Sequence, residues 1–245
     1  MGIDMKKMRE KYNALKSKGG SRKDNLFWKP QDGDQVIRIL PTSDGDPFKE
    51  FWFYYNLSGG PVLCPKKNFG EDSPVLDFAS SLYKEGTPDS IEMAKKLFPK
   101  QRFFSPVLVR GEEGQVVRVW GYSKTVYEQL LQLVLNPDYG DVTDVDEGTD
   151  LVLNYGKAPG AMFPSTKLTP KRKASSVCEK GDKDCEDLLG EIPDFDGLFE
   201  RRSTEQVQEL LDQFMQGDEE KEEVKKYASS GDDKVSKAFT ELLGS

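Results

Sequence analysis

The most informative stretch of this sequence is a strand–turn–strand–helix pattern near the middle of the chain. Residues 99–134 read PKQRFFSPVLVRGEEGQVVRVWGYSKTVYEQLLQLV. Two segments rich in β-branched and aromatic residues flank the turn sequence GEEG, and the last segment repeats apolar residues at helical spacing. The pattern predicts a β-hairpin followed by an amphipathic helix, so a sheet must form a large part of the fold.

Further strands are predicted on both sides of this hairpin. Gln35–Leu40 alternates as a strand does and is bounded by DGD turns, and Asp150–Tyr155 is another strand-like segment. Phe48–Leu57 contains five consecutive aromatic rings at 51–55. Because successive side chains of a strand point to opposite faces, some of these rings are expected outside the core. The prediction is a mainly β fold with added helices, that is, an α+β fold.

The remaining segments are less regular. Residues 58–99 are predicted to form a small irregular subdomain with one short helix near Ser90–Leu97. A second helix is predicted at Thr204–Met215, after a polar acidic linker.

Charge divides the chain into three zones. The net charge is −8, but residues 1–176 hold 26 Lys/Arg against 23 Asp/Glu, while residues 177–245 hold 9 against 20. The pattern predicts a basic arm at 1–24, a core at 25–215 and an acidic, mobile tail at 216–245. Apolar residues recur in the arm at helical spacing, so the arm either docks on its own domain as a solvated helix or contacts a neighbouring subunit or phosphate.

Several classes of function are disfavoured by what the sequence lacks. It contains no histidine, no GxxxxGK[ST] or GxGxxG phosphate loop, and no apolar run long enough to span a membrane. An enzyme is therefore not expected, and no membrane partner is expected. The start has no signal-peptide pattern, and three cysteines are too few for a disulfide framework, so a reducing intracellular compartment is predicted.

The hairpin interleaves cations with rings, which is the composition that single-stranded nucleic acid requires. A positive groove holds the backbone, and each base stacked on a ring contributes about 1–3 kcal/mol. The alternative is that the rings form the core while the charges form a solvated face. The candidate residues are Lys100, Arg102, Phe103, Phe104, Arg110, Arg118, Trp120, Tyr122 and Lys124.

A second basic segment follows at 167–176, KLTPKRKASS, and is predicted to be a loop. Its cations Lys167, Lys171, Arg172 and Lys173 are expected to contact phosphates, which would make affinity fall steeply with salt. The alternative is an ordinary solvated surface loop. A zinc site is not expected, because Cys64 lacks a CxxC partner and lies more than a hundred residues from Cys178 and Cys185.

Three segments together resemble a known family: FWKPQDGDQVIRILP, LCPKKNFGEDSPVL and KQRFFSPVLVRGEEGQVVRVWGYSKTV. The chain resembles, over roughly residues 25–215, the single-stranded-DNA-binding (helix-destabilising) proteins of T-even-like phages. The resemblance implies an OB-fold core that binds the strand and a basic arm that associates with neighbouring copies of the protein on DNA. It also implies an acidic tail that recruits replication and recombination proteins, in the cytoplasm of an infected host cell.

The resemblance also assigns roles to residues. It implies nucleic-acid contacts for Arg38, Lys100, Arg102, Phe103, Phe104, Lys124 and Phe163. The family often holds zinc through one histidine and three cysteines, two of them in a CPVC motif. Here that motif reads Ser73-Pro74-Val75-Leu76, so the subdomain is expected to fold without a cofactor, with Phe69, Val75, Leu76 and Phe78 as apolar filling. The arm lacks the family's run of basic and then hydroxyl residues near residue 5.

The leading hypothesis is sequence-independent binding of single-stranded DNA in phage DNA replication, recombination and repair, without catalysis. An RNA-binding OB protein is the first alternative, since stacking and phosphate contacts do not select the sugar. An acidic protein-protein adaptor is the second, and it predicts no salt-dependent affinity for nucleic acid. A metal-dependent hydrolase is the third. The acidic tail is expected to compete for the positive groove or to recruit partners.

Overall fold

The computed structural model describes residues 26–57, 60–112, 115–178 and 182–216. The predictions for the arm at 1–24 and for the tail beyond residue 216 lie outside the described residues. The chain divides into two compact units. Unit 1 comprises Met1–Phe51 and Gln101–Leu198, and unit 2 comprises Trp52–Lys100 and Phe199–Ser245.

The fold is mixed α+β, as predicted, with an eight-stranded sheet in the described residues. Six of its strands follow the order β1-β6-β5-β2-β7-β8. All neighbours on this path are antiparallel except β1 and β6. The strands are β1 (Phe27–Trp28), β2 (Gly33–Ile39), β3 (Lys49–Tyr54), β4 (Val62–Leu63), β5 (Lys100–Val109), β6 (Arg118–Tyr122), β7 (Thr149–Gly156) and β8 (Ser165–Ala174).

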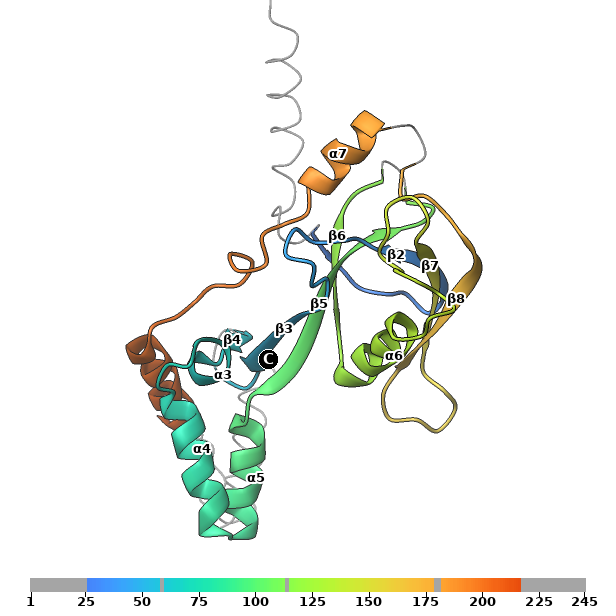
Figure 1. Ribbon diagram of the computed structural model, residues 1–245. Coiled ribbons are helices and arrows are strands. Elements are labelled where there is room, and N and C mark those ends of the chain that lie inside the picture. Colours follow the sequence, from blue (N-terminus) through green and yellow to red (C-terminus); the bar gives the residue numbers. More distant parts are fainter. Residues whose placement is uncertain (1–25, 58–59, 113–114, 179–181, 217–245) are drawn as a thin grey trace, which may run out of the picture. The chain divides into compact units, whose positions relative to one another are not determined.

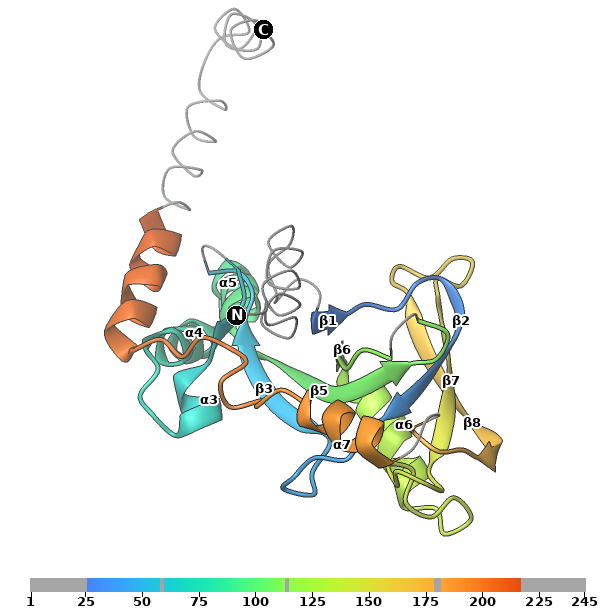
Figure 2. The ribbon, with the colours of Figure 1, turned by 90° about the horizontal axis from the view of Figure 1, so that it is seen from above.

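The core of unit 1 forms between one face of this sheet and helix α6 (Lys124–Val134). The register sets Phe103 opposite Tyr122 on β5 and β6, and period-two alternation turns alternate side chains of both strands toward the core. Val126 and Leu130 of α6, one turn apart, complete the same cluster. Figures 1 and 2 show α6 lying against the part of the sheet that contains β7 and β8. The predicted hairpin and following helix are confirmed.

The opposite face of β5 carries a second apolar cluster of unit 1. Leu108 of β5 packs there with Leu40, which follows β2, and with Val177, which follows β8. Leu188 of helix α7 (Asp182–Gly190) joins the same cluster. The outer face of β5 is therefore covered by the segment that follows β8.

Unit 2 corrects the prediction of an irregular subdomain at 58–99. It contains helices α3 (Pro65–Phe69), α4 (Pro74–Glu85) and α5 (Pro88–Leu97), and a further helix covers residues 204–216. Each of the three labelled helices begins with proline, whose fixed φ suits the first turn. Gly70 and Gly86 end α3 and α4 at φ 74° and 80°, a left-handed conformation that favours glycine. Residues 204–216 agree with the helix predicted at Thr204–Met215.

The core of unit 2 uses some of the predicted apolar filling. Val75 is fully buried, and Phe78 packs against the same cluster. Leu76 is half-buried. Phe69 is exposed instead, and the Arg201 guanidinium lies 4.4 Å from its ring centroid. The prediction that Phe69 fills this core is therefore wrong.

Candidate functional site

The β7–β8 connection in unit 1 exposes two adjacent apolar side chains. A turn begins the loop, in which the Ala161 amide donates to the Ala158 carbonyl at 3.0 Å and Gly160 has φ 81°. Pro159 and Gly160 occupy the two central positions that a type II turn favours. Met162 and Phe163 follow the turn and are 81% and 75% exposed. Two large apolar side chains exposed side by side are typical of an interaction surface.

Strand β8 carries the basic segment that was predicted to be a loop. Lys167, Lys171, Arg172 and Lys173 all lie on it and are all exposed. Within the part of the chain that the structure describes, none of these four cations forms an ion pair. The prediction of a loop is wrong because β8 is the last strand of the sheet path, where a proline such as Pro170 is tolerated.

Helix α6 fixes the start of β8 through one side chain. Gln129 Nε2 donates to the Thr166 carbonyl at 3.1 Å, and the Leu168 amide donates to Gln129 Oε1 at 3.0 Å. These bonds satisfy backbone groups of β8 and hold the strand beside α6 (Figure 1). The exposed loop therefore leads directly into a rigid, basic strand.

Lys124, at the start of α6, is exposed, and its Nζ lies 3.8 Å from Glu128 Oε1.

Arg38 is not available to a ligand, which corrects its predicted role. It is fully buried, and its Nε donates to Asp150 Oδ1 at 2.9 Å. Its other nitrogens donate to the Asp144 carbonyl at 3.0 Å and to the carbonyl and hydroxyl of Ser175. A Cβ at Gly148 would collide with this guanidinium, so glycine makes room for it. Arg38 therefore joins β2 to the segments around it.

Arg110 completes this buried network from the end of β5. Its Nη2 lies 3.2 Å from Asp150 Oδ1 and donates to the Ser176 carbonyl at 2.7 Å, and its Nη1 donates to the Val177 carbonyl at 3.2 Å. Burial alone would raise the pKa of Asp150, but the hydrogen bonds and charges of Arg110 and Arg38 outweigh it and lower this pKa below its ordinary value. Asp150 is the residue that sequence reasoning missed, because a lone acid at a strand end carries no motif.

The rings of the hairpin lie in the core rather than in a groove. Phe103, Trp120 and Tyr122 are at most 5% exposed and belong to the cluster beneath α6. Phe104, 8% exposed, points to the other face, where the rings of Phe27 and Phe51 lie against it. These four rings are too deeply buried to stack on bases, so the prediction of stacking is wrong for them. The alternative, in which the rings of the hairpin form the core, describes Phe103, Phe104, Trp120 and Tyr122.

The cations of the hairpin differ in exposure and in hydrogen-bond partners. Arg118 is half-buried and its Nε lies 3.2 Å from Glu112 Oε2. Arg102 is half-buried and donates to the Gln101 carbonyl at 3.3 Å. Lys100 is exposed at the start of β5 and belongs to unit 2. Of the predicted residues, Phe163 and the four cations of β8 lie on one hairpin, with Phe163 in its loop and the cations along the strand.

Cys64 takes part in a hydrogen-bonded cluster inside unit 2. The Tyr54 hydroxyl lies 2.7 Å from Ser73 Oγ and 3.1 Å from Cys64 Sγ, and all three residues are buried. Burial raises the pKa of the Tyr54 hydroxyl, so it stays protonated. Among the described residues there is no group of three His, Cys, Asp or Glu side chains that could hold a metal.

We expect Tyr54→Phe to lower the free energy of unfolding of unit 2 by about 1–3 kcal/mol, because Ser73 Oγ loses its partner in a buried site. Chemical denaturation followed by circular dichroism measures the change. Tyr83→Phe is the matched control, since Tyr83 is 54% exposed and should change stability by less than about 0.5 kcal/mol. Equal stabilities of the two variants would show that the cluster contributes nothing.

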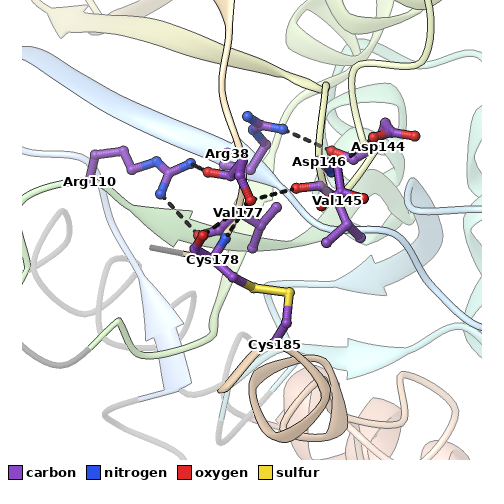
Figure 3. The surroundings of a disulfide bond; sticks show 9 residues. Arg38, Arg110, Asp144, Val145, Asp146, Val177, Cys178 and Cys185 are labelled. Carbon is purple, nitrogen blue, oxygen red and sulfur yellow. Dashed lines mark hydrogen bonds between the residues drawn. A yellow bond between two sulfur atoms is a disulfide. The ribbon is translucent and has the colours of Figure 1, made fainter. Parts of the chain in front are cut away.

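The cysteines after β8 bear on the predicted reducing compartment. Cys178 and Cys185 form a disulfide, with Cα atoms 5.4 Å apart (Figure 3). The prediction of a reducing compartment rested on cysteines too sparse for a disulfide framework, and that argument no longer holds. No helix among the described residues is long and apolar enough to cross a membrane.

A scan against protein-family models finds no match, and a search of curated proteins finds none either.

Proposed function

We propose that unit 1 binds single-stranded nucleic acid, with single-stranded DNA as the first candidate, without sequence preference and without catalysis. In this proposal the exposed side chains of Met162 and Phe163 stack against bases, and the cations of β8 contact phosphates. Stacking is tolerant of sequence because every base has a π face. The observation that carries the proposal is that one hairpin has an exposed aromatic residue in its loop and four exposed cations along β8, none of them in an ion pair among the described residues.

The strand connections support an OB-like interpretation of this unit. Strands β2, β5 and β6 are antiparallel neighbours in the sheet, α6 follows β6, and β7 and β8 form a hairpin in which β7 pairs with β2. An OB fold is a five-stranded, partly open Greek-key barrel that binds oligonucleotides with its second and third strands and with the loops after its first and fourth strands. The β7–β8 loop corresponds to the loop after the fourth strand, so Met162 and Phe163 would lie where such folds bind.

The phage replication role extends this proposal and rests on the resemblance of the sequence. In that role the basic arm associates with neighbouring copies on DNA, and the acidic tail recruits replication and recombination proteins or competes with DNA for the positive surface. The tail at 216–245 holds 5 Lys/Arg against 8 Asp/Glu, and the longer C-terminal region 177–245 holds 9 against 20, so the end of the chain carries the negative charge that such competition requires. The setting would be the cytoplasm of an infected host cell.

The test is a fluorescence-anisotropy titration of labelled oligo-dT and oligo-U with the full chain and its Phe163→Ala variant. Loss of one stacked base is expected to weaken binding by about 1–3 kcal/mol, or roughly 5- to 150-fold. Leu135→Ala is the matched control, because Leu135 is 78% exposed after α6 and should leave affinity unchanged. Tighter binding of oligo-U would favour RNA, and absence of salt-dependent binding to either strand would overturn the proposal.

A further inference from the structure

The disulfide joins two segments that are held in different ways. On one side, the segment after β8 is held by hydrogen bonds that do not involve the disulfide. The Val177 amide donates to the Val145 carbonyl at 2.7 Å, and Arg110 donates to the carbonyls of Ser176 and Val177 (Figure 3). Val177 is also fully buried. This side of the disulfide is therefore anchored to the sheet by its own contacts.

On the other side, helix α7 has few ties of its own. Within the described residues, the hydrogen bonds of 185–192 are local: the Glu191 amide donates to the Leu188 carbonyl, and the Ile192 amide to the Leu189 carbonyl. Two side chains of this segment join the apolar cluster on the sheet: Leu188, which packs with Leu40 and Leu108, and the partly buried Ile192. The disulfide is thus the covalent tie that holds α7 against an apolar surface.

We propose that Cys178–Cys185 is a redox-sensitive clasp that holds α7 over the outer face of β5 and releases it on reduction. Both cysteines are half-buried rather than enclosed, so a dithiol can reach the bond. One thiolate of the dithiol attacks one sulfur and displaces the other cysteine as a thiolate. The second thiolate of the dithiol then resolves the mixed disulfide. The protein gains two electrons and two protons as a dithiol, and the reductant becomes a cyclic disulfide.

Release of α7 changes two features of unit 1. It takes Leu188 and Ile192 off the apolar cluster that contains Leu40 and Leu108, and so exposes part of that cluster. It also removes one wall of a cavity of about 610 Å³, which Leu189 and Ile192 line together with Pro41 and Lys49. The anchored segment at 175–178 stays in place, because its hydrogen bonds are independent of the disulfide.

The clasp makes unit 1 respond to the compartment that contains it. Glutathione and thioredoxin systems keep thiols reduced in a cytosol, whereas secreted and periplasmic proteins retain their disulfides. The released state with an apolar surface on β5 would form in the first environment and the closed state in the second. This inference concerns α7 and the sheet beneath it and does not depend on the proposed function.

Hydrogen–deuterium exchange of the full chain, with and without dithiothreitol, tests the clasp. On reduction, we expect amide exchange in 185–192 to rise by at least about 10-fold, because released segments exchange through low-cost opening. The Val177 amide should remain protected. Cys178→Ser/Cys185→Ser should reproduce the reduced state without reductant and should not change further when reductant is added.

Alkylation and mass spectrometry establish the thiol state in the same samples. If Cys178 and Cys185 are both alkylated after reduction while exchange in 185–192 is unchanged, the clasp is overturned. Loss of Val177 protection together with α7 would also contradict it, since that result means the whole unit has unfolded. Alkylation of both thiols in protein purified without reductant, under oxidising conditions, would show that the disulfide does not form.

Discussion

Replacing Lys171, Arg172 and Lys173 together by glutamate is expected to weaken binding of oligo-dT by about 100-fold or more at low salt. The three cations are exposed on β8, and within the described residues none has a carboxylate partner, so their charge is available to phosphate. Each phosphate contact to a single strand contributes about −0.7 to the slope of log affinity against log salt. The slope should therefore become shallower by about 2. Anisotropy titrations at several salt concentrations measure both quantities.

A matched variant distinguishes local contacts from overall charge. Lys84, Lys95 and Lys96 are exposed on α4 and α5 of unit 2, and reversing all three changes the net charge by the same amount. We expect this control to lower affinity by less than about 3-fold at physiological salt, because it leaves the β8 cations in place and salt screens the change in overall charge. Equal losses in the two triple variants would argue that β8 has no direct contact with phosphate.

The structure offers one competing explanation for the cations of β8. Exposed lysines on an edge strand oppose edge-to-edge pairing between molecules, and β8 ends the path of the sheet. If this were their only role, the β8 variant would aggregate while its monomer bound oligo-dT normally. Size-exclusion chromatography of each variant before titration separates the two explanations.

How far the sequence predicts this fold depends on whether the signal is local. The hairpin of β5 and β6 and helix α6 were predictable because alternation, a glycine turn and helical spacing follow one another within 99–134. The helices of unit 2 carried local signals as well, since Pro65, Pro74 and Pro88 stand at helix starts. Proline and glycine occur in irregular segments and also at the ends of helices, so the same residues fit both the predicted irregular subdomain and the observed helices.

The errors at the candidate site have a common cause in tertiary structure. Arg38 has the sequence context of an exposed strand cation, but its burial depends on Asp150, which is 112 residues away. Likewise, cations and rings alternate along the hairpin, yet whether Trp120 faces a groove or the core depends on where α6 packs. Phe163 differs from these residues, because it is exposed in a loop that begins with a local turn. Its prediction as a site residue came from the family resemblance alone.

Arg38→Met is expected to destabilise unit 1 by about 3–5 kcal/mol, the usual cost of removing one partner from a buried ion pair. The change leaves Asp150 buried with only Arg110, and it leaves the carbonyl of Asp144 with only the Gly148 amide as donor. The double variant Arg38→Met/Asp150→Leu should lose less than the sum of the two single variants, because the two most deeply buried charges are removed together and only the partly exposed Arg110 loses its carboxylate. Urea denaturation followed by circular dichroism measures each free energy of unfolding. Arg201→Met is the control, since its pair with Glu71 is exposed and should cost about 1 kcal/mol or less.

The same network makes the stability of unit 1 depend on pH through the ionisation of Asp150. Because Arg110 and Arg38 hold the pKa of Asp150 below its ordinary value despite burial, the unfolded chain binds the Asp150 proton more readily than the folded chain does. The stabilisation is therefore complete above the pKa of the unfolded state, about 3.9, and is lost as pH falls from there through the folded pKa. Between pH 6 and pH 3 the wild type should lose more stability than Arg38→Met/Asp150→Leu, which has no such carboxylate. Parallel losses in the two proteins would mean that other carboxylates dominate acid unfolding and that Asp150 is not preferentially ionised by folding.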